Sequence, residues 1–139
     1  MAAELKVLFD LNVILDVLQR REPFYDMSAR ILAAAETRVV EGWVAAHSLT
    51  TLFYLLARYQ SAEQARVALT DLLTFLSVAA VDHEVIEQAL NLPYRDFEDT
   101  VQMMAAARSG MYYLVTRNVR DYGLGPIPVL QPAELLALL

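Results

Sequence analysis

The sequence predicts an α/β fold, with a central parallel sheet of four to five strands and helices on both of its faces. Short apolar runs typical of buried strands alternate with longer segments whose apolar residues recur at helical spacing. That alternation is typical of βαβ units, in which successive strands run parallel. Length and composition agree, because 139 residues with 57% hydrophobic content suffice for one domain, residues 1–139, with a substantial core.

The first predicted strand is Lys6–Phe9, which is short, apolar and rich in residues that favour strands. Later strands are predicted for apolar stretches that are bounded by turn-forming residues or by helices. These strands span residues 43–46, 78–81, 111–116 and 129–130.

Helices are predicted where apolar residues share one face and capping residues mark an end. Ser48 and Asp82 are expected N-caps, because their side-chain oxygens can accept a backbone N–H of the first turn. Gly110 ends the sixth helix, and Pro132 opens the last one. The predicted helices span residues 12–19, 26–35, 48–59, 62–76, 84–90, 96–109 and 132–138.

Composition and charge exclude several classes of site. The chain has no cysteine, so disulfides, thiolate metal sites and cysteine nucleophiles are excluded. A bound metal would need oxygen or imidazole ligands, which favours Mg²⁺ or Mn²⁺. The formal net charge of −6 argues against a protein that grips long duplex DNA through its phosphates.

Neither a secretory signal nor a membrane span is predicted. The N-terminus lacks a basic region followed by an apolar stretch and a cleavage site. No apolar run approaches the ~20 residues that cross a bilayer. We therefore expect a cytoplasmic protein that does not enter the membrane.

Polar residues gather where the predicted strands end. In open parallel sheets, ligands bind outside the carboxyl ends of the strands. Several carboxylates that converge there repel one another, and a divalent cation would neutralise them. Such an ion activates water for displacement at phosphorus, which is the chemistry of a metal-dependent nuclease. The candidates are Asp10 and Asn12 after the first strand, Asp96, Glu98 and Asp99 at the start of helix 96–109, and Thr116, Asn118 and Asp121 after strand 111–116.

Each cluster also has a structural interpretation. Asp10 and Asn12 suit the N-cap of the helix that follows them. Asp96 with Asp99 resembles a capping box, and both acids suit the positive end of the helix dipole. The polar residues after strand 111–116 are also common in turns. Asp16 is expected on the solvated face of its helix.

Two segments carry a family resemblance. The run FDLNVILDVLQRREPF resembles the opening of PIN-domain proteins, especially the VapC-like toxin ribonucleases of bacterial toxin–antitoxin pairs. The run DFEDTVQMMAAARSGMYYLVTRNVRDY is similar to their second signature, and IPVLQPAELLALL is similar to their C-terminal endings. The resemblance extends over nearly the whole chain, with matching order and spacing.

The resemblance implies a PIN-like three-layer α/β/α sandwich and a Mg²⁺- or Mn²⁺-dependent endoribonuclease activity. Asp10, Asp99 and Asp121 match the family's catalytic acids and metal ligands, and Asp96 matches an additional acid of one branch. The supporting residues that it implies, which would orient the site or a metal-bound water, are Asn12, Thr116 and Asn118.

One position departs from the family pattern. The helix after the second strand usually supplies a glutamate, but SLTTLFYLLARY contains no acid. Ser48, Thr50 or Thr51 would take its place with a neutral and weaker ligand. A PIN-like RNA- or protein-binding module with little or no catalysis is therefore an alternative. A phosphoacceptor receiver domain is a weaker one, because it needs a lysine near the last strand and the only lysine is Lys6.

Predictions about partners rest on the resemblance and on hydrophobicity. Toxin-like members pair with a small antitoxin and dimerise through early helices, so we expect both partners, with surfaces at residues 24–32 and 49–56. Arg117 and Arg120 are candidates for contacts with RNA phosphates, and solvated surface arginines are the alternative.

Overall fold

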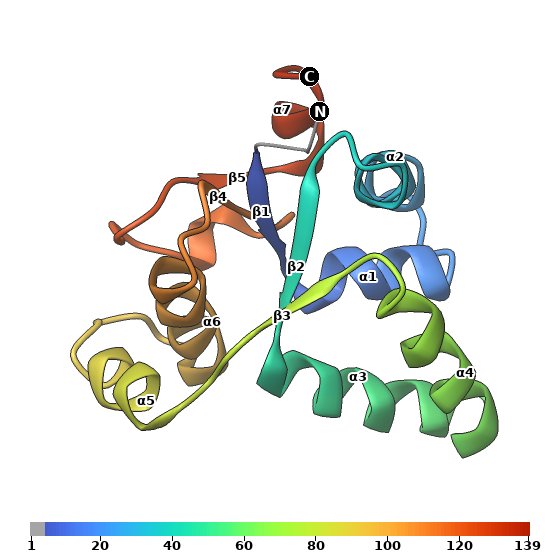
Figure 1. The fold of residues 1–139 in the computed structure, drawn as a ribbon, viewed down its shortest axis with the longest axis horizontal. Helices are drawn as coiled ribbons and strands as arrows, with labels where there is room; N and C mark the ends of the chain where they lie inside the picture. Colours follow the sequence, from blue (N-terminus) through green and yellow to red (C-terminus); the bar gives the residue numbers. More distant parts are fainter. Residues whose placement is uncertain (1–4) are drawn as a thin grey trace.

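The computed structural model describes residues 5–139. Residues 1–4 lie outside the described part of the chain. Two predictions fall partly on them, namely that the N-terminus carries no secretory signal and that one domain spans residues 1–139. Figure 1 shows strands and helices in alternation along most of the chain. The elements are β1 (Lys6–Phe9), α1 (Leu11–Leu18), α2 (Tyr25–Glu36), β2 (Glu41–Ala45), α3 (Ala46–Tyr59), α4 (Ala62–Leu72), β3 (Ser77–Ala79), α5 (His83–Ala89), α6 (Phe97–Arg108), β4 (Tyr113–Val115), the 3₁₀ turn η1 (Val119–Asp121), β5 (Val129–Leu130) and α7 (Pro132–Leu136).

The five strands form one parallel sheet in the order β3-β2-β1-β4-β5. The central strand is β1, and its Val7 pairs with Gly42 of β2 on one side and with Tyr113 of β4 on the other. The predicted α/β class and parallel sheet are therefore confirmed. Because the strands run parallel, their carboxyl ends meet at one edge, where Asp10 follows β1 and Thr116 follows β4.

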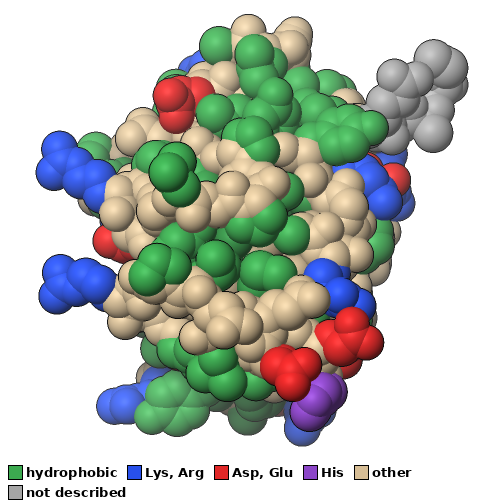
Figure 2. Space-filling view, turned by 90° about the vertical axis from the view of Figure 1, so that its left-hand side faces the viewer, with side chains coloured by type: hydrophobic (Ala, Val, Ile, Leu, Met, Phe, Trp, Pro, Cys, Tyr) green, Lys and Arg blue, Asp and Glu red, His purple; other side chains and the backbone are tan. Residues whose placement is uncertain are grey.

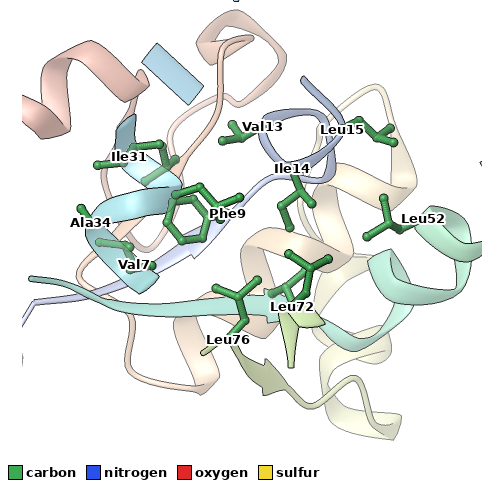
Figure 3. Packing of buried hydrophobic residues seen from close by; sticks show 14 of the residues in the cluster. Val7, Phe9, Val13, Ile14, Leu15, Ile31, Ala34, Leu52, Leu72 and Leu76 are labelled. Carbon is green, nitrogen blue, oxygen red and sulfur yellow. The ribbon is translucent and has the colours of Figure 1, made fainter. Parts of the chain in front are cut away.

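Alternate residues of β1 serve two cores, one on each face of the sheet. Val7 and Phe9 are fully buried against α1–α4 and α7 (Figure 3). Leu8, also fully buried, packs on the opposite face against α5 and α6. Figure 1 shows the same separation, with α5 and α6 on one side of the sheet and α1–α4 on the other. The fold is thus the predicted three-layer α/β/α sandwich.

Gly42 allows the close packing of β2 against the helices. A Cβ placed there would lie 2.7 Å from Leu76 Cδ2, 2.8 Å from Ala35 Cβ and 2.9 Å from Phe9 Cε2. These distances are shorter than van der Waals contact, so a larger residue at position 42 would push the core apart.

Several predicted details need correction. Asp82 caps α5 as predicted, since its side chain accepts a hydrogen bond from the Val85 N–H. Ser48 does not cap α3, because the helix already begins at Ala46. The helix predicted for residues 62–76 ends at Leu72, and a turn at residues 73–75 followed by Leu76 leads into β3.

The exposed surface includes several large hydrophobic side chains. Figure 2 looks onto the side that carries α5 and α6, where hydrophobic side chains lie over much of the face and basic ones project at its edges. Leu90 and Phe97 are exposed at the ends of these helices. Within residues 5–139, none of the helices has both the length and the apolar character needed to cross a bilayer.

Candidate active site

Asp10 follows the carboxyl end of β1, and both of its side-chain oxygens accept hydrogen bonds that hold the carboxylate in place. Its backbone N–H donates to Val115 O at 2.8 Å, which continues the pairing of β1 with β4. Thr116 Oγ1 donates to Asp10 Oδ2 at 2.7 Å, and Gln102 Nε2 donates to Asp10 Oδ1 at 3.3 Å. Asp10 occupies the N-cap position of α1, but its side chain makes no capping hydrogen bond. The capping interpretation of Asp10 is therefore wrong.

A hydrogen-bond network joins Asp10 to Asp99. Gln102 Nε2 also donates to the Tyr122 hydroxyl at 2.5 Å, and that hydroxyl donates to Asp99 Oδ1 at 3.2 Å. Gln102 and Tyr122 are both buried. Neither residue was identified from the sequence. The available signal was spacing, because Gln102 follows Asp99 by three positions and so shares its helix face.

Two adjoining cavities gather most of the predicted site residues. One, of about 220 Å³, is lined by Asp10, Asn12, Ser48, Thr51, Asp96 and Asp99, together with Gln102. The other, of about 860 Å³, is lined by Asp96, Asp99, Arg120 and Asp121. Because Asp96 and Asp99 line both cavities, the acids predicted from distant parts of the sequence border one continuous region.

The start of α6 supplies the two acids that the cavities share. Asp96 is the N-cap of α6, and its Oδ1 accepts the Asp99 N–H at 3.1 Å. Capping of α6 by Asp96 is thus confirmed, with the other oxygen of Asp96 left for a second interaction. Asp99 stands in the first turn, where the helix dipole favours a negative charge.

The carboxyl of Asp99 is strongly perturbed. Its pKa is raised from 3.8 to about 7, first by burial and then by the negative charges of Asp10 and Asp96. Asp121 also raises this pKa, whereas the hydrogen bond from Tyr122 lowers it. Perturbation by both burial and like charges is typical of functional sites.

The early turns of α3 line the smaller cavity with His47, Ser48 and Thr51, none of which is an acid. Ser48 Oγ lies 3.5 Å from Gln102 Oε1, and Thr51 Oγ1 donates to His47 O at 3.4 Å. His47 Nε2 lies 3.1 Å from Glu98 O, within hydrogen-bonding distance. No side chain of α3 brings an acid to the site.

Asn12 lines the smaller cavity, whereas Asn118 and Arg117 line neither cavity. Asn12 does not cap α1; its Oδ1 accepts a hydrogen bond from Arg21 Nη1 at 3.4 Å. The backbone N–H of Asn118 donates to Thr116 Oγ1 at 3.1 Å. Arg117 is neither a solvated surface arginine nor part of the two cavities, since its Nε lies 3.0 Å from Asp16 Oδ2.

The prediction that Asp16 is solvated is wrong. Its side chain is fully buried, and Ser28 Oγ donates to its Oδ2 at 3.3 Å. The helical spacing of α1 did not reveal this burial, because Asp16 lies between apolar residues and reads as the polar side of the helix.

The donor set partly suits a hard divalent cation. Nearby acids that raise one another's pKa would be relieved by a cation, and their oxygens are the ligands that Mg²⁺ prefers. Among residues 5–139, however, no three His, Asp or Glu side chains are arranged to hold one ion together. Mg²⁺ usually keeps several waters and binds through one or two carboxylates, so Asp10 and Asp99 fit that smaller requirement.

Similar solved structures share this fold. A toxin–antitoxin complex from Klebsiella pneumoniae has a TM-score of 0.68 at 19% identity, covering 91% of this chain and 97% of that chain. DNA-bound VapBC from Salmonella typhimurium gives 0.66 at 19% identity, covering 92% and 98%. VapC20 from Mycobacterium tuberculosis, a Sarcin-Ricin loop cleaving toxin, gives 0.62 at 16% identity, covering 78% and 86%.

Sequence comparison identifies the family. No curated protein matches the chain. A family model of the PIN domain matches residues 6–120, which run from β1 into η1 and leave out Asp121, β5 and α7. The chain therefore belongs to the PIN-domain family.

Proposed function

We propose that this chain is a Mg²⁺- or Mn²⁺-dependent endoribonuclease that cleaves RNA phosphodiester bonds and acts as the toxin of a toxin–antitoxin pair. One observation carries the proposal. Asp10, from the end of β1, and Asp99, from the start of α6, line the same cavity and are linked through Gln102 and Tyr122. Family membership supports the same reaction class.

In the proposed site, Asp10 and Asp99 hold the metal, and Asp96 and Asp121 border it as additional ligands or as acceptors for metal-bound water. The ion would supply charge neutralisation at phosphorus and an activated water. Thr116 and Gln102 fix the two oxygens of Asp10, which keeps its carboxylate in one orientation. Tyr122 does the same for Asp99.

Arg120 is the proposed contact for an RNA phosphate. It is exposed and lines the larger cavity beside Asp121. Phosphate binding needs a cation there because the surrounding acids repel RNA. Arg117 is not proposed for this role, since it pairs with Asp16 outside both cavities.

The metal-site assignment is tested by Asp10→Asn and Asp99→Asn. Each variant should lose more than about 100-fold in Mg²⁺-dependent RNA cleavage, beyond the usual effect of a group that only orients a ligand. Asp71→Asn, at an exposed acid on α4, is the matched control and should cleave like wild type. Wild-type cleavage by both site variants would refute the assignment.

A PIN-like binding module with weak or absent catalysis is the second candidate. Its support is the acid-free α3, which presents His47, Ser48 and Thr51 to the smaller cavity. Calorimetric titration with Mn²⁺ separates the two candidates. Binding heat and a raised melting temperature support the enzyme, whereas neither effect at millimolar Mn²⁺ supports the binding module.

An antitoxin is the proposed protein partner. The Klebsiella structure is a toxin–antitoxin complex and the Salmonella structure contains VapBC bound to DNA, so both support a partner of this kind. A short open reading frame next to the gene would encode it. Co-expression of that product should yield a stable complex with this chain and should suppress RNA cleavage; separate elution of the two proteins would contradict the pairing.

A homodimer and a cytoplasmic location are proposed as well. The dimer surface was expected on residues 24–32 and 49–56. Four residues of these segments are buried in the core and cannot contribute to it: Ile31, Leu32, Leu52 and Leu56. Exposed Tyr54 on α3 remains available. Light scattering at micromolar concentration should give twice the monomer mass; the mass of a monomer would contradict the dimer.

A further inference from the structure

An ion pair links α1 to the turn that follows β4. Asp16, in the last turns of α1, has a fully buried side chain, and Arg117 Nε lies 3.0 Å from its Oδ2. This is a close ionic contact rather than an aligned hydrogen bond, because the Nε–H has no acceptor in suitable geometry within the described chain. The Phe24 ring lies 4.0 Å from the guanidinium carbon and covers it from α2's N-terminal side.

The ion pair adjoins residues of the proposed site through Arg117. Arg117 is flanked by Thr116, whose hydroxyl donates to Asp10, and by Asn118, whose N–H donates to that same hydroxyl. Asp10 and Asp16 stand at the two ends of α1. Two contacts therefore join α1 and the residue before it to the turn at residues 116–118. The ion pair connects Asp16 to Arg117, and the Thr116 hydroxyl donates to Asp10.

Stability alone does not account for this pair. Burial raises the pKa of Asp16 despite the opposing charge of Arg117, so desolvation outweighs the attraction. The second oxygen of Asp16 is buried with no hydrogen-bond partner in the described chain. Apolar residues in place of such buried pairs often leave stability unchanged or raised, which makes orientation the better explanation for the pair.

Arg117 also faces away from the proposed substrate region. It lines a cavity of about 230 Å³ together with Phe24, Ser28 and Gln131, and it lines neither of the cavities that contain the acids. From this geometry we infer that Arg117, anchored by Asp16, is a positioning residue that fixes the turn at 116–118 so that Thr116 orients the Asp10 carboxylate. The expected effect of Arg117 on catalysis rests on the proposed function, whereas its expected effect on the turn does not.

Amide hydrogen exchange tests the turn without metal or RNA. In Arg117→Gln, the Asn118 amide should exchange at least about tenfold faster than in wild type, because its acceptor Thr116 is no longer fixed. The Leu114 amide, which donates to Pro128 O in the sheet, is the internal control and should be unchanged. Unchanged exchange of the Asn118 amide would overturn the inference, whether or not the protein cleaves RNA.

A double variant separates positioning from stability. Asp16→Leu with Arg117→Met replaces the pair by apolar side chains and should retain the wild-type melting temperature within a few degrees. Its Asn118 amide should still exchange about tenfold faster than that of the wild type. Restored protection in this stable variant would show that the pair only fills space, and would overturn the inference.

Kinetics distinguish positioning from phosphate contact. If the wild type cleaves RNA, Arg117→Gln should lower kcat by about 10–100-fold with little change in KM, as expected for a group that orients a metal ligand. A raised KM with normal kcat would instead assign Arg117 to substrate binding. Arg108→Gln, which breaks the exposed pair with Glu84, is the matched control and should change neither constant.

Failure of the proposed function gives a different pattern. In that case the wild type neither cleaves RNA nor binds Mn²⁺, while the exchange of the Asn118 amide still responds to Arg117→Gln. Failure of the positioning inference leaves wild-type cleavage intact and Asn118 protected in the variants. The two outcomes are therefore separable in one set of proteins.

Discussion

Gln102 Nε2 donates to Asp10 Oδ1 at 3.3 Å and so ties the middle of α6 to the end of β1. The same nitrogen donates to the Tyr122 hydroxyl, which in turn donates to Asp99. One neutral side chain thus connects the two acids proposed as metal ligands. Because both acids repel each other when ionised, the connection fixes two groups that would otherwise move apart.

Gln102→Leu should therefore destabilise the protein and weaken the site together. Leucine has a similar size but removes the hydrogen bonds that Gln102 donates to Asp10 Oδ1 and to the Tyr122 hydroxyl oxygen, and an unmade hydrogen bond costs about 1–3 kcal/mol in buried positions. Urea denaturation measures this loss. Gln88→Leu, at an exposed position of α5, is the control and should change the free energy of unfolding by less than about 0.5 kcal/mol. Equal stability of the two variants would contradict the role of the network.

The raised pKa of Asp99 predicts a pH dependence for the metal-free protein. Its folded pKa of about 7 exceeds the ordinary value of 3.8, so between these values the native state binds the proton more tightly than the unfolded state. Stability therefore falls as pH rises from about 4 to about 7 and is not lost further above that range.

Asp99→Asn should remove this dependence. The variant keeps an oxygen for the Tyr122 hydroxyl but carries no charge, so at pH 8 without metal it should melt about 3 °C above wild type, roughly 1 kcal/mol for a solvent-screened carboxyl. At about pH 3, below both pKa values, Asp99 is mostly protonated in the folded and in the unfolded state, so the difference should shrink. A variant less stable than wild type at pH 8 would refute the assignment of the shift.

The sequence revealed the acids more readily than their supports. Asp10 and Asp99 stand where an apolar run ends and where a helix begins, and both boundaries are visible as changes of periodicity. Gln102 lies inside a helix, where its spacing from Asp99 places it on the same face but does not reveal its contacts with residues far away in the sequence. Asp16 was misassigned for the same reason, since only the packing of α2 and Arg117 over α1 buries it.

Boundaries of the elements were less predictable than their order. The strand predicted for 111–116 is reduced to Tyr113–Val115, because pairing with β1 and β5 decides its ends. Ser48 has a residue type suited to a cap, yet α3 starts two residues earlier at Ala46. Propensity therefore identified the kind of element, while tertiary contacts set its limits.

Gly42→Ala tests the packing of β2 against the helices. The added Cβ would meet Leu76, Ala35 and Phe9 at distances below 3.0 Å, so the core must shift to accept it. We expect a loss of about 1–3 kcal/mol in the free energy of unfolding. Gly123→Ala is the control, because its nearest neighbour, Tyr94 Cε1, lies 3.3 Å away on a partly exposed ring. Equal losses in both variants would contradict the packing argument.

Thr51→Glu tests whether the missing acid of α3 limits metal binding. Thr51 lines the smaller cavity with Asp10 and Asp99, so a glutamate there would add a carboxylate from α3 to the acids of the site. Mn²⁺ affinity measured by calorimetry should rise about tenfold, equivalent to roughly 1.4 kcal/mol. Without metal, the added charge should lower the melting temperature, since like charges in one cavity repel.

Thr50→Glu is the matched control for this gain of affinity. Both threonine hydroxyls donate to His47 O, at 2.8 Å for Thr50 and 3.4 Å for Thr51, so both variants lose the same kind of hydrogen bond. Both acids would also meet the same helix dipole in the early turns of α3. Thr50 is exposed and does not line the cavity, so its glutamate should leave Mn²⁺ affinity unchanged. Equal affinities in the two variants would mean that α3 does not face the metal, and that the acid-free helix has no bearing on catalysis.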